Sequence, residues 1–385
     1  MSRRRRGRAI SRPLRPWQRR FIRTRCDCRQ CRSVQSISGR ISFYRFEYAP
    51  QLSILIPLLA IGLVLSITAG VSLGAAPIPF STVWSIVGNK LHAGMFIVGW
   101  SKGQESIVWD VRFPRVILAA LVGAGLAVTG AVLQALTRNP LADPHLLGVS
   151  SGAAFGAILA LLHTGLILGL LTVPLFSFAG ALLATGAVGL TTHLTRSQSA
   201  DRLVLSGVAV AFVFTALGNL LIFLGDPRAT NTVVFWMLGG LGLAQWQHLV
   251  YPAGILFFCL VLLIPKAREL NALAMGDETA TTLGIAVKQF RLLLFVTTAL
   301  LTGVMVAFSG AIGFIGLMVP HFVRLIAGGD NVRVVPLSAV FGALILIWAD
   351  IVARLIMAPE DMPIGIVTGL VGGIAFILIL RRGQS

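Results

Sequence analysis

Apolar segments of near membrane-spanning length recur along almost the whole chain. A transmembrane α-helix needs about 20 such residues, and fewer where neighbouring protein shields it from lipid. Backbone N–H and C=O groups in hydrocarbon must bond within their own segment, so we expect each segment to be a helix. The ten expected spans are 52–73, 116–136, 146–162, 172–194, 203–224, 249–264, 292–312, 313–327, 335–356 and 364–380. The sequence therefore predicts an all-α membrane protein of about ten transmembrane helices.

Positive charge is concentrated at the start of the chain. Hydrophobic residues make up 56% of the sequence and charged ones 12%, which excludes an ordinary water-soluble domain. The formal net charge is +18, and residues 1–50 hold 15 arginines. A polybasic stretch before a span usually lies on the cytoplasmic surface against anionic lipid. We expect residues 1–50 to be a disordered basic cytoplasmic tail and 51–385 to form the ten-span domain. Nucleic-acid binding is the alternative for the tail, but no folded module accompanies the arginines.

Residues that usually hold metals or nucleotides do not form the required patterns. Cys26, Cys28 and Cys31 read C-x-C-x-x-C, but no second ligand pair follows, so disordered cysteines are favoured over a metal site. The six histidines show no paired-ligand spacing. No G-x-x-x-x-G-K-[ST] loop is present to cradle phosphates. We therefore expect no metal and no cofactor in this chain, and any ATP hydrolysis must come from another polypeptide.

The longest polar interval between the spans has a distinctive internal pattern. It runs over 268–291, and we call it the knuckle. Gly276 and Gly284 are expected to end two short helical runs in the left-handed conformation. Asp277 and Glu278 open the second run, where carboxylates favour the positive end of the helix dipole. This pattern predicts a compact element on the membrane surface that is offered to a soluble partner.

Basic residues of the short loops predict the orientation of the chain. With the tail inside, the interior loops collect Arg138, Arg196, Arg202, Lys266, Arg268, Lys288, Arg291, Arg324, Arg333, Arg381 and Arg382. The exterior loops hold fewer: Lys90, Lys102, Arg112, Arg115, Arg228 and Arg354. The positive-inside rule then places the knuckle and both termini on the cytoplasmic side. Six of the ten spans precede the knuckle and four follow it. Two five-helix halves of the chain would enter the membrane in opposite directions, so two inverted halves are expected, as in many transporters.

Three exterior arginines are expected to gather near the outer surface. Arg112 and Arg115 precede the second span, and Arg354 closes the ninth. They could snorkel to lipid phosphates or dock an acidic extracytoplasmic partner, and the pattern leaves both open. Asp350 stands one turn before Arg354 as an i, i+4 pair.

Small and polar residues within two spans indicate either close helix packing or a pathway. Gly365, Gly369 and Gly373 recur every four residues on the tenth span, as Gly152 and Gly156 do on the third. The candidate pathway residues of the fifth and tenth spans are Ser206, Thr215, Asn219, Gly365, Thr368 and Gly369. Hydrogen bonding within helices is the alternative role of the polar members. Residues 233–243 are too short to cross and are expected to form an interfacial helix.

Two other activities can be weighed from single residues. A proton-driven secondary transporter would need a buried ionisable relay, and Asp350 alone is thin support for one. An intramembrane serine enzyme would need Ser150, which stands in the G-x-S-x-G spelling of residues 148–152. A nucleophile elbow requires a strand-to-helix turn, whereas this stretch opens a membrane helix. We therefore expect packing and capping there, and no enzyme.

Several ordered motifs along 52–382 together resemble one transporter family. They are Arg112-Phe113-Pro114-Arg115, NPLADP from Asn139, SSGAAFGA from Ser150, MGDETATTLGI from Met275, SGAIGFIGLMVPHFVRLIAG from Ser309, ADIVAR from Ala349 and MPIGIVTG from Met362. In this combination the chain resembles the membrane permease of iron-chelate and cobalamin ABC importers. Two departures stand out: the tail exceeds the usual short amino terminus, and Ile374 stands where the family commonly has proline.

The resemblance implies partners and roles. It implies ten spans, a second copy of the chain around a central pathway, two cytoplasmic ABC ATPase subunits, an extracytoplasmic binding protein and a bacterial inner-membrane location. The residues it implies for ATPase coupling are Met275, Gly276, Asp277, Glu278, Thr279, Thr282, Leu283 and Gly284. Arg112, Arg115 and Arg354 match basic residues that meet the binding protein, and the fifth and tenth spans would line the pathway. The expected cargo is an iron chelate, either a ferric siderophore or haem, and cobalamin is the alternative.

Overall fold

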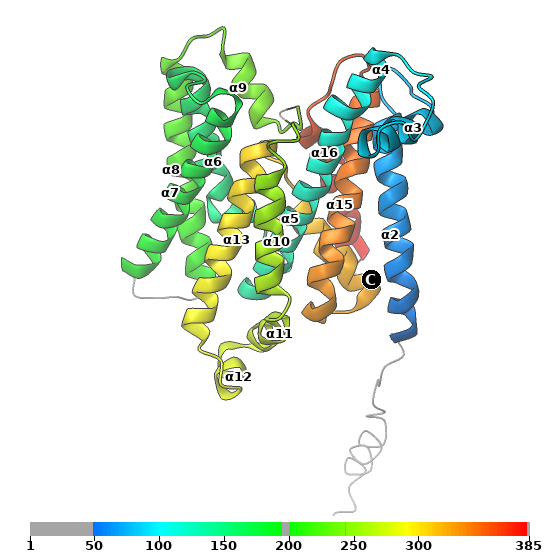
Figure 1. The fold of residues 1–385 in the computed structure, drawn as a ribbon. Coiled ribbons are helices and arrows are strands. Elements are labelled where there is room, and N and C mark those ends of the chain that lie inside the picture. Colours follow the sequence, from blue (N-terminus) through cyan, green and yellow to red (C-terminus); the bar gives the residue numbers. More distant parts are fainter. Residues whose placement is uncertain (1–48, 195–199, 243, 383–385) are drawn as a thin grey trace, which may run out of the picture. The chain divides into compact units, whose positions relative to one another are not determined.

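The computed structural model describes residues 49–194, 200–242 and 244–382, and the regular elements within these ranges are helices (Figure 1). Residues 55–385 belong to one compact unit. The predicted basic tail, with Cys26, Cys28 and Cys31, lies outside the described residues apart from Ala49 and Pro50, which begin the first helix.

The helices follow the predicted segments closely. In chain order they are α2 (Ala49–Ser72), α3 (Phe80–Leu91), α4 (Lys102–Ser106), η2 (Ile107–Arg112), α5 (Phe113–Thr137), η3 (Pro144–Leu147), α6 (Val149–Leu159), η4 (Ala160–Thr164), η5 (Gly169–Leu171), α7 (Thr172–Leu194), α8 (Ala200–Leu224), α9 (Thr230–Met237), α10 (Val250–Leu263), α11 (Ala267–Met275), α12 (Asp277–Thr282), α13 (Val287–Ser309), α14 (Ile315–Ala327), α15 (Asn331–Ile356) and α16 (Ile364–Arg382). Each of the ten expected spans overlaps an α-helix of this series, and the third is shared between α6 and the turns η3 and η4. The all-helical membrane fold is therefore confirmed.

Length and composition separate these helices into groups. Within the described residues, five stretches are long and apolar enough to cross a membrane alone, namely Lys102–Thr137, Gly169–Leu194, Arg202–Leu224, Val287–Ser309 and Asn331–Ile356. The helices α10 and α11 pass the test together but are bent by 64°. Four further helices are apolar but shorter, and these are parts of α2, α6 with η4, α14 and α16. Short spans of this kind require shielding by neighbouring helices.

Two segments differ from the expectation. Residues 102–112 continue α5 backwards through α4 and the π-helical turn η2, because Ser101 and Gln104 form a capping box that starts the helix early. The helix α3 was not expected at all, since its 12 residues fall well short of a span. The short helix α9 (Thr230–Met237) overlaps the helix expected at 233–243 but ends at Met237, and its interfacial position stays a prediction. The inverted relation of the two halves stays a prediction.

Glycines allow the central helix α5 to touch its neighbours backbone to backbone. A Cβ added at Gly123 would lie 2.2 Å from the carbonyl oxygen of Gly342 on α15, and one at Gly130 would lie 1.8 Å from that of Gly316 on α14. Gly152 and Gly156 make similar contacts with α7, as their spacing predicted. Such small residues let membrane helices pack closely without side-chain interdigitation.

The glycines of α16 behave differently from the expected stripe. Gly365 lies against the carbonyl oxygen of Leu238, where a Cβ would be 2.1 Å away, whereas a Cβ at Gly369 would meet open space. Close contact returns at Gly372, which faces Phe314. One face of α16 is therefore packed at two points two turns apart, with space between them.

Candidate functional site

The knuckle contains two short helices at one end of the bundle. Helices α11 and α12 project there between α10 and α13, while α3, α4 and α9 lie at the opposite end (Figure 1). Gly284 has φ +81°, and the amides of Gly284 and Ile285 donate to Thr281 and Ala280 over 2.9 and 3.0 Å. This pair of hydrogen bonds forms a Schellman motif, so the predicted left-handed end of α12 is present.

Gly276 departs from the expected conformation. It has φ +131° and ψ 156°, which is an extended backbone with positive φ and not the left-handed helical region. Only glycine adopts this region readily. The chain therefore turns sharply between α11 and α12, and Asp277 and Glu278 occupy the first turn of α12 as predicted.

An ion pair ties α12 to α13. The Nη2 of Arg291 donates to the two carboxylate oxygens of Asp277 over 2.9 and 3.0 Å. Arg291 is buried, so its charge needs a close carboxylate. Arg138, which follows α5 with φ +53°, lies 3.8 Å from the same carboxylate. Asp277 thereby connects the knuckle to two membrane helices.

A second polar contact ties α11 to the start of α15. Asn271 donates to Asp330 over 2.7 Å and accepts two bonds of 2.8 Å from the backbone and side chain of Asn331. Asp330 also caps α15 by accepting from the amide of Val332. Sequence reasoning did not find these residues as part of the site, although an Asp-Asn pair before an apolar run is a helix-start signal.

The outer surface of the knuckle is partly apolar. Met275 and Leu283 are 67% and 63% exposed, and Glu278, Thr282 and Gly284 are exposed beside them. Ala280 is fully buried beneath, and Thr279 is half-buried. Exposed apolar side chains on a folded, tethered element are typical of a protein-binding surface.

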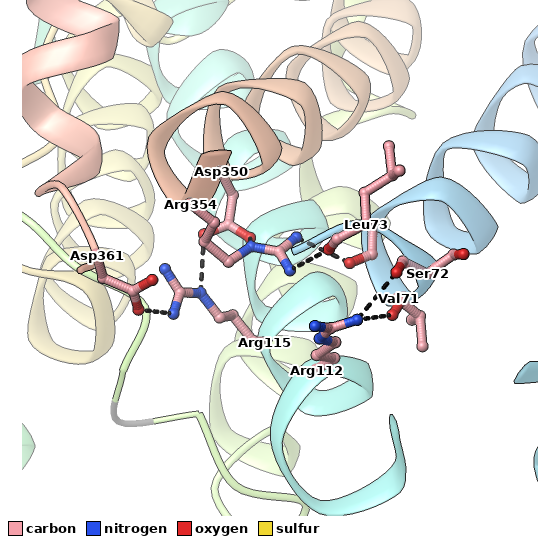
Figure 2. Close-up of polar contacts among 9 residues, drawn as sticks. Val71, Ser72, Leu73, Arg112, Arg115, Asp350, Arg354 and Asp361 are labelled. Atoms are coloured by element: carbon pink, nitrogen blue, oxygen red, sulfur yellow. Dashed lines mark hydrogen bonds and ion pairs between the residues drawn. The ribbon is translucent and has the colours of Figure 1, made fainter. Parts of the chain in front are cut away.

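The predicted basic residues meet at the opposite end, around the end of α2 (Figure 2). Arg112 donates to the carbonyl oxygens of Val71, Ser72 and Ala76 over 3.1, 2.9 and 2.7 Å. Its side chain is consequently buried. These carbonyls belong to the end of α2 and the turn after it, where no helical partner is available.

Arg354 supports the same helix end from α15. It donates to the carbonyl oxygens of Leu73 and Gly70 over 2.9 and 2.8 Å. Its Nε lies 3.0 Å from Asp350, which confirms the predicted i, i+4 ion pair, although the contact is not aligned as a hydrogen bond.

Arg115 completes the cluster. Its Nε donates to Asp350 over 2.9 Å, and its Nη1 bonds to Asp361 in the loop between α15 and α16. In Figure 2 the Arg115 guanidinium lies between these two carboxylates. The Asp350 side chain is 1% exposed, whereas that of Asp361 is 55% exposed.

The expectation of an open basic rim needs correction. The three arginines do come together, but Arg112 and Arg354 are buried and bonded to backbone carbonyls, so neither is presented to lipid phosphates or to a partner in this conformation. Sequence reasoning missed this because backbone carbonyls leave no mark in a sequence. Only Arg115, with its exposed partner Asp361, lies at the edge of the cluster.

The predicted pathway residues are carried by helices with different neighbours. On α8, Thr215 and Asn219 are exposed and Ser206 is half-buried, and α8 packs against α6 and α7. On α16, Thr368 is buried, and this helix packs against α14 and α15. Gly365 donates its amide to Leu238 over 3.1 Å. A shared pathway between the two helices stays a prediction.

Ser150 and the metal-ligating residue types show no assembled reactive centre in the described part of the chain. Ser150 lies in the first turn of α6 after the 3-10 turn η3, and its buried hydroxyl has no hydrogen-bond partner there. Within the same described ranges, no three His, Cys, Asp or Glu side chains are grouped as metal ligands.

Loss of the Asp350 charge is expected to destabilise the protein strongly. Asp350→Asn leaves Arg115 and Arg354 without their shared buried carboxylate, and breaking a buried pair costs about 3–5 kcal/mol. The matched control is Asp361→Asn, whose exposed ion pair is worth about 1 kcal/mol or less. Reversible unfolding in mixed micelles by SDS titration measures both. Equal stability of the two variants would contradict a central role for Asp350.

Comparison with known proteins agrees with the fold and the motifs. A sequence model of the FecCD transport family matches residues 59–382. The chain is 37% identical over 339 residues to the hemin transport system permease protein HmuU of Yersinia pestis, covering 87% of this chain and 95% of that protein. It is 40% identical over 286 residues to the vitamin B12 import system permease protein BtuC of Klebsiella pneumoniae, covering 74% and 85%.

A solved structure has the same architecture. It is described as an inward-facing conformation of a putative metal-chelate type ABC transporter, and it matches with a TM-score of 0.73 at 29% identity, covering 86% of this chain and 99% of its own. The resemblance predicted from the motifs is therefore confirmed. The chain belongs to the FecCD transport family: it is the multi-pass permease of an ABC importer, which works with an ATPase and a binding protein and is not itself an enzyme.

Proposed function

We propose that this permease imports an iron chelate, a ferric siderophore or haem, across the bacterial cytoplasmic membrane. The observation that carries the mechanism is the tethered knuckle, with Met275 and Leu283 exposed on a surface that two polar contacts hold against the membrane helices. Cobalamin is the alternative cargo, because the identities to a hemin permease and to a vitamin B12 permease are 37% and 40% and do not separate the two.

The knuckle is the proposed seat of the ATPase subunits. Its exposed residues Met275, Glu278 and Leu283 would enter a cleft of the ATPase, and Ala280 beneath them keeps α12 in place. A displacement of α12 by the ATPase would be transmitted to α13 through the ion pair between Asp277 and Arg291. The same displacement would be transmitted to α15 through the hydrogen bonds of Asn271 with Asp330 and Asn331.

Helix α15 would carry that motion to the other end of the bundle. Its 26 residues extend about 39 Å at 1.5 Å per residue. Its first residue, Asn331, bonds to the knuckle helix α11, and Asp350 and Arg354 stand near its last turn. The loop after it leads into α16, which we infer lines the pathway. One rigid element would thus connect the ATPase with the pathway.

The proposed docking site for the binding protein is the edge of the arginine cluster. Arg115 is the member that an acidic partner could reach, because its present partner Asp361 is exposed. Arg112 and Arg354 would act there as positioning residues, since both hold the end of α2 in place. An incoming carboxylate would compete with Asp361 for the same guanidinium.

The orientation and the assembly are parts of the same proposal. The excess of Arg and Lys in the loops on the knuckle side supports a cytoplasmic knuckle and cytoplasmic termini. A second copy of the chain would complete the pathway along α8 and α16. The largely exposed apolar surface of α8 supports this, because a membrane helix with few intrachain neighbours is available for another subunit.

The cargo is tested with the cognate binding protein. We expect its intrinsic fluorescence to be quenched on titration with haem or a ferric siderophore, and not with cobalamin. Uptake of the same compound by proteoliposomes that hold the complete transporter then ties binding to transport. Tight binding of cobalamin alone would replace the iron-chelate assignment.

The coupling role is tested by placing charge on the apolar surface of the knuckle. The double variant Met275→Asp and Leu283→Asp changes exposed side chains, so the permease should still fold and insert. We expect it to lose its ATPase during purification of the complete transporter from membranes. Met357→Asp, an exposed methionine at the other end, is the control and should retain the ATPase. Full retention by the double variant would refute the coupling role.

The docking role is tested with two opposite changes at one contact. Arg115→Glu should weaken binding of the cognate binding protein to the permease in nanodiscs, and the loss should shrink at high salt because rim charges are screened. Asp361→Asn should strengthen binding, because it removes the competing carboxylate. Affinity measured by surface plasmon resonance decides, with thermal stability recorded alongside. Unchanged affinity in both variants would count against docking at Arg115.

A further inference from the structure

The segment between α2 and α4 carries apolar side chains that face away from the protein. Helix α3 buries Val83, Ile86 and Val87. A second stripe beside them is exposed and apolar: Phe80, Trp84 and Leu91. At about 100° per residue these three lie within roughly 40° of one another. The polar residues Ser81, Ser85 and Asn89 occupy the opposite arc, so α3 is amphipathic with an apolar arc wider than the protein covers.

The loop that follows α3 extends this apolar surface. Met95, Phe96, Ile97 and Val98 are all exposed, and Ile97 is 95% exposed. The loop is nevertheless fixed, because Asn89 donates to the carbonyl of Phe96 over 2.9 Å and accepts from its amide over 2.7 Å. The Phe96 ring also lies over Gly88, where a Cβ would be 2.5 Å from it. The protein therefore holds an apolar tip outward at a defined position.

The position of α3 along the bundle is set by the end of α2. Ser72, the last residue of α2, accepts from the amide of Ile78 over 3.2 Å and donates its hydroxyl to the Ile78 carbonyl. Figure 1 shows α3 at that end of α2. The outward side chains of α2, such as Leu58, Ile61 and Leu65, are exposed apolar groups of a membrane helix and face hydrocarbon. The exposed stripe of α3 therefore lies at the level where the span ends.

We propose that residues 80–98 lie in the bilayer interface at this end, with Phe80, Trp84, Leu91 and Ile97 inserted into the lipid. An amphipathic helix with aromatic and aliphatic residues on one face binds at the depth of the headgroups and upper acyl chains. Tryptophan favours this depth because its ring is apolar and its N–H is polar.

Charge favours lipid over a protein partner as the occupant. Lys90 is the only Lys, Arg, Asp or Glu in residues 80–98, and it is paired with Glu105 on α4 over 2.6 Å. The exposed stripe and loop therefore offer apolar side chains and no unpaired ionic group to a charged partner. The lipid around α2 is already adjacent and covers them without a further component.

The anchor has a structural consequence for the arginine cluster. The ion pair of Lys90 ties α3 to α4, and α4 runs without a break into η2, which ends at Arg112. Trp100 adds a bond of 3.3 Å to the same Glu105. Insertion of α3 would thus fix the height of Arg112 and the cluster relative to the membrane surface.

Site-directed fluorescence tests the proposal on the full chain in nanodiscs. With Cys26, Cys28 and Cys31 replaced by serine, single variants Leu91→Cys and Ile97→Cys are labelled with an environment-sensitive fluorophore. Leu65→Cys on α2 is the lipid-facing control, and Ser81→Cys on the polar arc is the water-facing one. We expect the labels at positions 91 and 97 to emit at shorter wavelength than the label at 81. They should also be quenched by brominated lipid to an extent similar to the label at 65.

Two results would overturn the proposal. Emission at positions 91 and 97 that matches position 81, without quenching by brominated lipid, places the segment in water. A short-wavelength emission that brominated lipid does not quench, or that arises only after the binding protein is added, assigns the surface to a protein contact. The measurement needs neither ATPase nor cargo, so its outcome is independent of the proposed transport function.

Discussion

A single buried carboxylate balances two of the three guanidinium groups that gather inside one end of this membrane protein. Asp350 contacts both Arg115 and Arg354, and its side chain is almost completely removed from solvent. Burial of a charge without a close counter-charge is strongly unfavourable. With that counter-charge in place, Arg354 and its neighbour Arg112 can donate to the carbonyl groups at the end of α2, which have no partners within their own helix. The first membrane helix is therefore held by backbone contacts that depend on an acid from another helix.

The two ends of the permease are joined through α15. At one end Asn331 bonds to the helix that leads into the knuckle, and at the other Asp350 and Arg354 hold the end of α2. Between them, Gly342 brings α15 against the backbone of α5. The polar elements at the two surfaces are thus parts of one connected framework, although each has a separate proposed partner.

The sequence predicted the features that depend on neighbouring residues and missed those that depend on residues far away in the chain. The spans could be predicted because apolar length is a local property, and the end of α12 could be predicted because Gly284 is itself the signal. The environment of Arg112 could not, because its partners are backbone carbonyls some 40 residues away that any sequence would supply. The bond between Asn271 and Asp330 likewise joins residues 59 positions apart. Helix α3 was missed because a short amphipathic helix gives no span-length signal.

The glycine contact between α5 and α15 limits where the molecule can deform. A Cβ added at either Gly123 or Gly342 would lie 2.2 Å from the carbonyl oxygen of the other glycine. The two backbones therefore interlock and cannot slide past each other by a turn. The pair must then travel as one rod during any change of access. Any relative displacement is then expected at helices outside this pair, such as α16, where a Cβ at Gly369 would meet no atom of the same chain.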